Sequence, residues 1–373
     1  MPWNWQHKKW PNFDYNLDLI EEFERSFLKK SGELIGSIKH LNDEDTDSVK
    51  VTLLSEEAFQ TSKIEGELLE RDSLHSSIRK HFGLKTDNRR VGPAERGISE
   101  MMVNLYQNCA SPLDHDQLFD WHRMLMNGRS DLDDFGTYRT HEDPMQIISG
   151  PIEFPTVHFE APPSIRVNDE MEQFVKWFND SENTLGHSHP LVRAGIAHIY
   201  FESIHPFEDG NGRIGRALSE KSLSQNIGQP TLIALSHTIE QNKKSYYEAL
   251  HRASIDIDIT EWLVYFSNIT LEAIHYSQST IELLVEKSKF FHQFQGKLNE
   301  RQHKVVLRLF AVGIGGFIGG LSAENYIAIT RTTASTATRD LQKLVEMGAF
   351  KRTGERKGTR YSLNIDHNHA SFK

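Results

Sequence analysis

The twelve residues from His205 to Arg216, HPFEDGNGRIGR, concentrate side chains that handle phosphate. Arg213 and Arg216 lie three positions apart and share one face of a helix, where guanidinium groups can grip phosphate oxygens through paired hydrogen bonds. Asp209 suits one ligand position of a Mg²⁺ ion that otherwise keeps its waters and phosphate ligands. His205 is the one group in the run that can take a proton from a hydroxyl near pH 7. This inventory predicts a site that binds a polyphosphate and activates a hydroxyl group.

Two glycines shape the backbone of the same run. Gly210 and Gly212 lack Cβ atoms, so the chain can turn there with positive φ and present its N–H groups to an anion. From Ile214 onward the pattern predicts a helix, whose N-terminus carries partial positive charge. We therefore expect the phosphates to lie over this turn and the start of the helix.

The run resembles the signature of the Fic (filamentation induced by cAMP) family, His-Pro-Phe-x-Asp/Glu-Gly-Asn-Gly-Arg-x-x-Arg, and matches it at every defined position. The resemblance implies transfer of AMP from ATP to a hydroxyl side chain of a target protein. The implied roles are general base for His205, Mg²⁺ ligand for Asp209, α-phosphate cradle for Gly210, Asn211 and Gly212, β-phosphate ligand for Arg213 and γ-phosphate ligand for Arg216.

A second motif lies far upstream, in the run TSKIEG of residues 61–66. On a helix Thr61 and Glu65 lie on one face, and Gly66 ends the helix. The run resembles the inhibitory motif of the same family, Ser/Thr-x-x-x-Glu-Gly/Asn. That resemblance implies that Glu65 reaches Arg216 and occupies the place of the γ-phosphate. The alternative is an ordinary helix end without a regulatory role.

Two other segments are candidates for binding the target and the base. Residues 136–140 and 146–150 lead into residues 156–160, which alternate like a short strand. The segment resembles the family's hairpin flap, which clamps the target segment by strand addition. A surface hairpin without a partner is the alternative. Tyr246 and Tyr247 are candidates for stacking on a nucleobase, although one of two adjacent helical residues normally points into the core. The flap residues expected to dock the target are Val157, His158 and Phe159.

Apolar residues at three- and four-residue steps predict helices along most of the chain. The acidic run at residues 42–47 is expected to be a solvated loop. The helical periodicity and the resemblance to the Fic family together imply a mostly α fold class: an all-helical Fic core with a small β-hairpin flap, followed by a C-terminal winged helix-turn-helix domain. The expected helices cover 18–41, 51–65, 118–126, 168–177, 189–201, 245–250 and 260–266. The expected domains are 1–90, a tryptophan-rich arm and helical region with the inhibitory helix; 91–290, the catalytic domain; and 298–373, the winged helix-turn-helix.

The C-terminal region has a composition unlike the rest of the chain. Helices over about 301–310, 322–329 and 334–347, then a hairpin to 363, resemble a winged helix-turn-helix. Residues 331–360 hold eight Lys or Arg and three Asp or Glu, inside a chain of net charge −10. Such a local inversion is what contact with DNA phosphates requires, whereas protein docking and a solvated hairpin are the alternatives. The glycine-rich run at 313–320 has no counterpart in this pattern.

Bulk composition is that of an ordinary soluble globular protein, with 38% hydrophobic and 25% charged residues among 373. The single cysteine, Cys109, cannot form an internal disulfide, which favours a reducing, cytoplasmic location and a core role. No apolar segment approaches the length of a membrane span, so no membrane partner is expected.

Three of the six tryptophans lie in the first ten residues. We expect this arm to pack either on its own domain or on a second subunit of a homo-oligomer. The histidines at 187, 189, 198 and 205 do not have the spacing of a zinc site.

The leading hypothesis is a self-inhibited protein adenylyltransferase that uses Mg²⁺ and ATP to modify Tyr, Thr or Ser hydroxyls of a target protein and of itself. Removal of AMP on the same scaffold, with Glu65 positioning a water, is an alternative. A third hypothesis is a DNA-binding regulator whose Fic-like portion senses nucleotide.

Overall fold

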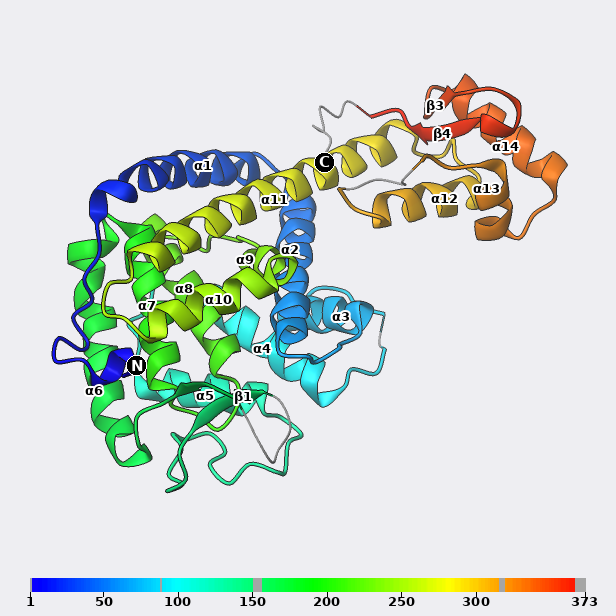
Figure 1. Ribbon diagram of the computed structural model, residues 1–373. Coiled ribbons are helices and arrows are strands. Elements are labelled where there is room, and N and C mark those ends of the chain that lie inside the picture. Colours follow the sequence, from blue (N-terminus) through cyan, green and yellow to red (C-terminus); the bar gives the residue numbers. More distant parts are fainter. Residues whose placement is uncertain (1, 88, 150–155, 315–318, 366–373) are drawn as a thin grey trace. The chain divides into compact units, whose positions relative to one another are not determined.

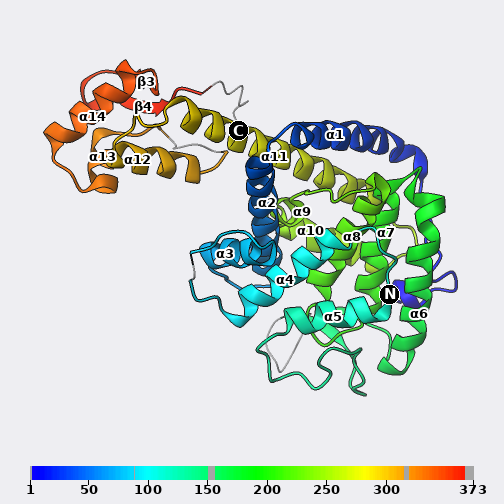
Figure 2. The same cartoon turned by 180° about the vertical axis from the view of Figure 1, so that it is seen from behind.

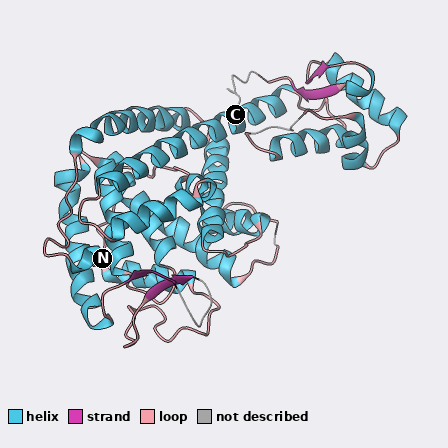
Figure 3. Cartoon of the chain, in the orientation of Figure 1, coloured by secondary structure: helices cyan, strands magenta, loops and turns pink. Residues whose placement is uncertain are grey.

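The computed structural model describes residues 2–87, 89–149, 156–314 and 319–365. The chain divides into two compact units, one of residues 1–40 and 50–277 and the other of residues 41–49 and 278–373. Helices make up most of the described chain, and strands occur only in two short hairpins (Figure 3). The mostly α fold is confirmed. The first unit contains residues from both the expected N-terminal domain, 1–90, and the expected catalytic domain, 91–290.

The elements of the first unit can be followed in Figures 1 and 2. Irregular segments and one small hairpin connect a set of packed helices. Two helices, α2 and α11, continue into the second unit. The elements are α1 (Glu21–Lys39), α2 (Asp43–Ile64), α3 (Arg71–His81), α4 (Pro93–Gln107), α5 (His115–Leu125), β1 (Gln146–Ser149), β2 (Thr156–Glu160), α6 (Ser164–Ser181), α7 (Pro190–Ile204), α8 (Asn211–Ile227), α9 (Leu235–Gln241), α10 (Lys243–Ser254) and α11 (Thr260–Gln293).

Helices α7 and α8 form the centre of this unit. Every residue of α7 except Glu202 is buried, as expected for a helix that is apolar on all sides. Helix α8 is also largely buried although it carries many polar residues. The loop between them carries the phosphate-handling run, so the two most enclosed helices of the unit hold the candidate site.

The acidic run after residue 41 is helical, and the expectation of a loop was wrong. Helix α2 begins at Asp43, and the side chain of Asn42 accepts a hydrogen bond of 2.9 Å from the backbone N–H of Asp45. Acidic side chains in a first turn are stabilised by the partial positive charge of the helix N-terminus. The charges that suggested a solvated loop therefore favour the start of a helix.

The tryptophan-rich arm packs on its own unit, and the lone Cys109 is buried as expected. Trp5 lies in a small apolar cluster with Phe159 and Ala161. Among the described residues, no helix combines the length and the apolar character needed to cross a membrane.

The second unit has its own apolar core, centred on residues of three short helices and a hairpin. The buried Asp340 carboxylate accepts hydrogen bonds from Arg301 and from the Tyr326 hydroxyl, which ties the helices together. Part of the glycine-rich run, residues 315–318, lies outside the described residues. The order of the elements matches the expected one, and their assignment to the winged helix-turn-helix class stays a prediction. The elements of the second unit are α12 (Glu300–Ala311), α13 (Ala323–Thr330), α14 (Ala334–Glu346), β3 (Phe350–Thr353) and β4 (Arg360–Leu363).

Candidate active site

The backbone of His205 is held in an unusual conformation. It ends α7 in the left-handed region, with φ 50° and ψ 60°, which non-glycine residues adopt only where their surroundings enforce it. The buried Arg139 supplies that support: its Nε donates to the His205 carbonyl at 2.8 Å and its Nη2 donates to the Pro162 carbonyl at 2.6 Å. The Arg139 backbone N–H also donates to the Pro206 carbonyl at 2.9 Å. Sequence reasoning missed Arg139, because nothing in the segment around it indicates a role in the site.

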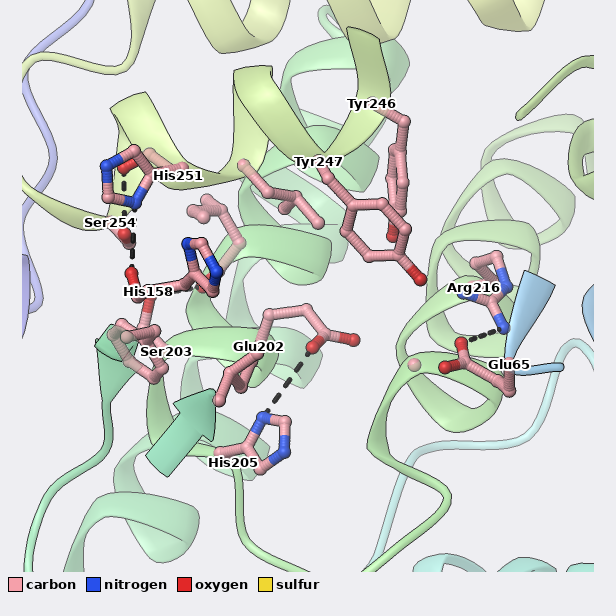
Figure 4. A pocket seen from close by; sticks show the side chains of 15 residues that line it. Glu65, His158, Glu202, Ser203, His205, Arg216, Tyr246, Tyr247, His251 and Ser254 are labelled. Carbon is pink, nitrogen blue, oxygen red and sulfur yellow. Dashed lines mark hydrogen bonds and ion pairs between the residues drawn. The ribbon is translucent and has the colours of Figure 1, made fainter. Parts of the chain in front are cut away.

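The imidazole of His205 is neutral at pH 7 and can accept a proton. Burial, reinforced by the positive charge of Arg139, lowers the pKa of His205 to about 4. Its Nδ1 lies 3.8 Å from Oε2 of Glu202 (Figure 4). Burial and the nearby Glu65 raise the pKa of Glu202 to about 8, although Arg216 opposes them. The sequence analysis overlooked Glu202; its position three residues before the histidine on one helix is the signal that could have found it.

The glycine turn leads directly into the start of α8, and the expected anion site at this point stays a prediction. Gly210 has a φ of 86°, and the first turn of a helix has N–H groups without intrahelical acceptors. The side chain of Asn211 is bound within the loop. Its Oδ1 accepts from the Phe207 N–H at 3.0 Å, and its Nδ2 donates to the Phe207 carbonyl at 2.8 Å. These contacts close the loop, and the expected role of Asn211 in a phosphate cradle stays a prediction.

Arg216 is buried and bound by the end of α2. Its Nη2 donates to Oε1 of Glu65 at 2.7 Å (Figure 4). Its Nε donates to Oγ1 of Thr61 at 2.8 Å. Burial would lower the pKa of Arg216, but the Glu65 carboxylate raises it above its usual value. A Cβ added to Gly212 would overlap the Glu65 carboxylate. The Glu65 carboxylate therefore lies between the buried Arg216 guanidinium and the first turn of α8.

The C-terminal end of α2 is fixed by contacts besides the Glu65 pair. Gly66 adopts a φ of 84° after the last helical turn, as predicted for a residue that ends a helix. Lys243 donates to the Ile64 carbonyl, and Lys63 pairs with Glu240 at 2.8 Å. These contacts fix the end of α2, and with it Glu65, beside Arg216 of α8.

Asp209 and Arg213 pair with each other and with further charged residues. Oδ1 of Asp209 accepts from Arg213 at 3.2 Å and Oδ2 accepts from Arg129 at 2.8 Å. Arg213 also pairs with Glu67 at 3.0 Å. Burial would raise the pKa of Asp209, but Arg213 and Arg129 lower it, so the carboxylate is charged at neutral pH.

The donor set around Asp209 fits Mg²⁺ only together with phosphate ligands. Among the described residues, no group of three or more His, Cys, Asp or Glu side chains is placed to hold a metal ion. One carboxylate with phosphate oxygens and waters is, however, the usual protein environment of Mg²⁺. Asp209 is therefore suited to an ion that arrives with a nucleotide.

A cavity of about 530 Å³ adjoins His205 and extends between the flap and α10 (Figure 4). Tyr247, 42% exposed, stands at the cavity, whereas Tyr246 is buried and its hydroxyl lies 2.7 Å from Nε2 of His198. One tyrosine of the pair thus points into the core, as expected. The lining residues are Glu65, Ile147, His158, Phe159, Ile199, Glu202, Ser203, His205, Gly212, Arg216, Tyr246, Tyr247, Leu250, His251 and Ser254.

The flap is an antiparallel pair of β1 and β2 with an irregularity between Ile147 and Ile148. Gly150 and residues 151–155 lie outside the described residues. Val157 and His158 are exposed, in keeping with a docking surface, but the Phe159 side chain is buried beneath the tryptophan arm. The Phe159 side chain therefore anchors the flap to the arm, and its expected part in target docking stays a prediction.

Comparison with known proteins gives two family matches. Residues 112–223 match the Fic/DOC family, and residues 3–84 match a domain of unknown function (DUF4172). The chain is similar to the protein adenylyltransferase fic-1 of Caenorhabditis elegans, with 31% identity over 140 residues, 38% of this chain and 24% of that protein. It is also similar to fic-1 of Caenorhabditis briggsae, with 24% identity over 248 residues, 64% of this chain and 44% of that protein. The chain thus spans less than half of either relative.

A solved structure of a Fic family protein from Desulfovibrio desulfuricans G20 is similar over nearly the whole chain. It covers 95% of this chain and 98% of its own, with a TM-score of 0.52 and 22% identity. At that identity the likeness establishes a shared fold.

Proposed function

Because this chain carries a Fic/DOC family domain over residues 112–223, we propose that it is a protein adenylyltransferase held inactive by its own Glu65. The observation that carries the proposal is the ion pair between Glu65 and the buried Arg216 at the start of α8. An anion already sits where the terminal phosphate of a nucleotide would be bound. The same cavity contains a neutral histidine that can accept a proton.

We assign positions to ATP and to the acceptor hydroxyl from the residues around the cavity. The phosphates of ATP would lie over the first turn of α8, between Arg213 and Arg216, and the base would lie beside Tyr247 and α10. A cavity of about 530 Å³ is in the range of small-molecule sites. The acceptor is a Tyr, Thr or Ser hydroxyl of a target protein, presented as a strand along the flap.

The proposed reaction forms one bond and breaks one. His205 takes the proton of the acceptor hydroxyl, and the oxygen attacks the α-phosphorus in line. The bond from the α-phosphorus to the bridging oxygen breaks, and pyrophosphate leaves between Arg213 and Arg216. A Mg²⁺ ion held by Asp209 and the phosphates would neutralise part of the phosphate charge. With Glu65 on Arg216, the γ-phosphate cannot take its place, so the α-phosphorus is not presented to His205.

Labelled ATP tests this assignment. Incubation of the Glu65→Gly variant, in which Arg216 is released, with ATP labelled at the α-phosphate should label protein, whereas ATP labelled at the γ-phosphate should not. Label retained from both positions, or from the γ-position alone, would indicate another reaction.

Removal of AMP is a second activity that the position of Glu65 favours. Its carboxylate lines the same cavity as His205, so it could orient a water for attack on an AMP-modified hydroxyl. Incubation of AMP-modified protein with the wild type and with Glu65→Gln separates the two activities, since only release of AMP would require the carboxylate.

A separate proposal concerns the second unit. Most basic side chains of α14 and the hairpin are exposed, whereas one of the three acidic residues in this stretch, Asp340, is buried and paired with Arg301. Uncompensated basic charge beside a polar helix is the arrangement that binds duplex DNA. A gel-shift assay with the full chain tests this proposal.

A further inference from the structure

The N-terminal arm, residues 2–16, contacts three walls of the candidate active site but takes no part in the proposed chemistry. It has little regular structure beyond one short turn of 3-10 helix, Asn4–Gln6. It lies in the region that matches a domain of unknown function. Its contacts show what the arm does for the neighbouring elements.

The first contact is with the flap. Nε1 of Trp5 donates to the Glu160 carbonyl at 2.7 Å, at the end of β2. The ring of Trp3 meets the ring of Phe159 edge-on, with centroids 5.3 Å apart. A two-stranded hairpin alone is marginally stable in water, so this buried aromatic contact fixes the flap to the body of the protein.

The second and third contacts are with helices that line the cavity. The buried side chain of Asn4 donates through Nδ2 to Oγ of Ser203 at 2.8 Å and to the Ala253 carbonyl at 3.1 Å. Ser203 lies two residues before His205 on α7, and Ala253 belongs to α10. Consecutive residues of the arm therefore hold the flap, the catalytic helix and the far wall of the cavity together.

We infer that the arm is a strap that sets the position of the target-docking flap relative to His205. The inference rests on the proposed function, because the flap is taken to bind the target as an added strand. A flap fixed before binding loses less conformational entropy when the target docks, so the strap lowers the KM for the target. The arm touches neither the phosphate site nor the Glu65–Arg216 pair, and binding of ATP does not depend on it.

Hydrogen exchange of the full chain tests the strap without reference to activity. We expect Trp3→Ala and Trp5→Ala to speed exchange of the β1 and β2 amides about ten-fold or more, and to leave the amides of α8 unchanged. Phe13→Ala is the matched control, since Phe13 lies on the same arm but packs on Trp10 and Tyr200. Unchanged flap exchange in both tryptophan variants, or equal acceleration in all three variants and throughout the unit, would overturn the inference.

Kinetics provide the second readout, in the Glu65→Gly background. The probe is a short peptide of extended sequence with one central tyrosine or threonine, supplied with saturating ATP. Trp5→Ala should raise the KM for the peptide several-fold and leave kcat and the KM for ATP within about two-fold. An unchanged KM for the peptide would contradict the strap. Absence of transfer even in the Glu65→Gly parent would contradict the proposed function instead, and the exchange experiment would then decide on the strap.

Discussion

At the scale of single residues, His205 has the environment of a base and Arg216 that of an anion ligand. We predict that His205→Ala abolishes AMP transfer while ATP still binds, because the imidazole removes a proton and does not grip phosphate. Loss of a general base typically costs about 10²–10⁴-fold in rate. Transfer from α-labelled ATP and a thermal shift with ATP measure the two effects separately. Undiminished labelling by His205→Ala would refute the mechanism.

Glu202 gives a prediction for stability against pH. Burial and Glu65, opposed by Arg216, raise its pKa from an ordinary 4.5 to about 8. His205, Tyr246 and Tyr247 are further titratable neighbours of this carboxyl. Between pH 4.5 and 8 the carboxyl of Glu202 therefore keeps its proton in the folded chain and loses it in the unfolded chain. The free energy of unfolding that this group contributes is lost as pH rises toward 8. Glu202→Gln cannot titrate. We expect the wild type to lose stability relative to this variant between about pH 5 and 8, with no further change above. Urea unfolding across this range measures the difference, and parallel curves for the two proteins would contradict the prediction.

How far the sequence predicts the site depends on whether the partners are local. Thr61 and Glu65 are four residues apart on a helix, so their shared face followed from spacing, and both do reach Arg216. Arg139 supports His205 from 66 residues away, and only the folded chain shows that contact. The role of Asn211 was implied by the family resemblance, whereas the hydrogen bonds of its side chain to the backbone of Phe207 appear only in the folded chain.

At the scale of elements, the C-terminal end of α2 binds Arg216 of α8 through two side chains, Thr61 and Glu65. Thr61→Val keeps the shape of the side chain but removes the acceptor for Nε of Arg216, leaving a buried donor without a partner. We expect a loss of about 1–3 kcal/mol in the free energy of unfolding. Ser62→Ala is the matched control, because the buried Oγ of Ser62 has no hydrogen-bond partner among the described residues. Chemical denaturation measures both variants, and an equal loss in the two would contradict a specific role for Thr61.

The elements themselves were largely predictable, and the errors have physical causes. Periodicity located α1, α5, α6 and β2 because each has one apolar face or a clear alternation. The start of α2 was missed because acidic residues suit both solvated loops and helix N-termini. The packing of Phe159 against Trp3 and Trp5 could not be read from the sequence, because these partners lie more than 150 residues away along the chain.

At the scale of the whole molecule, the exposed basic side chains of the second unit make duplex DNA a candidate partner. We predict that the full chain retards duplex DNA at low salt and that retardation falls steeply with added salt, since each phosphate contact releases counterions. Arg352→Ala with Arg356→Ala should weaken binding and reduce the salt dependence, without changing AMP transfer. Lys29→Ala with Lys30→Ala on α1 is the control of equal charge. No retardation by the wild type would favour a protein-docking role for this unit.

The central claim is that Glu65 restrains the enzyme by holding Arg216, and self-labelling with α-labelled ATP tests it most directly. Glu65→Gly should raise labelling above the wild type, because the freed arginine can take the γ-phosphate and orient the α-phosphorus. ATP replaces the lost carboxylate, so this variant should also show a larger thermal shift with ATP than the wild type. Arg216→Ala should erase the gain when combined with Glu65→Gly. A double variant as active as Glu65→Gly alone, or labelling in Glu65→Gly no higher than in the wild type, would contradict the account.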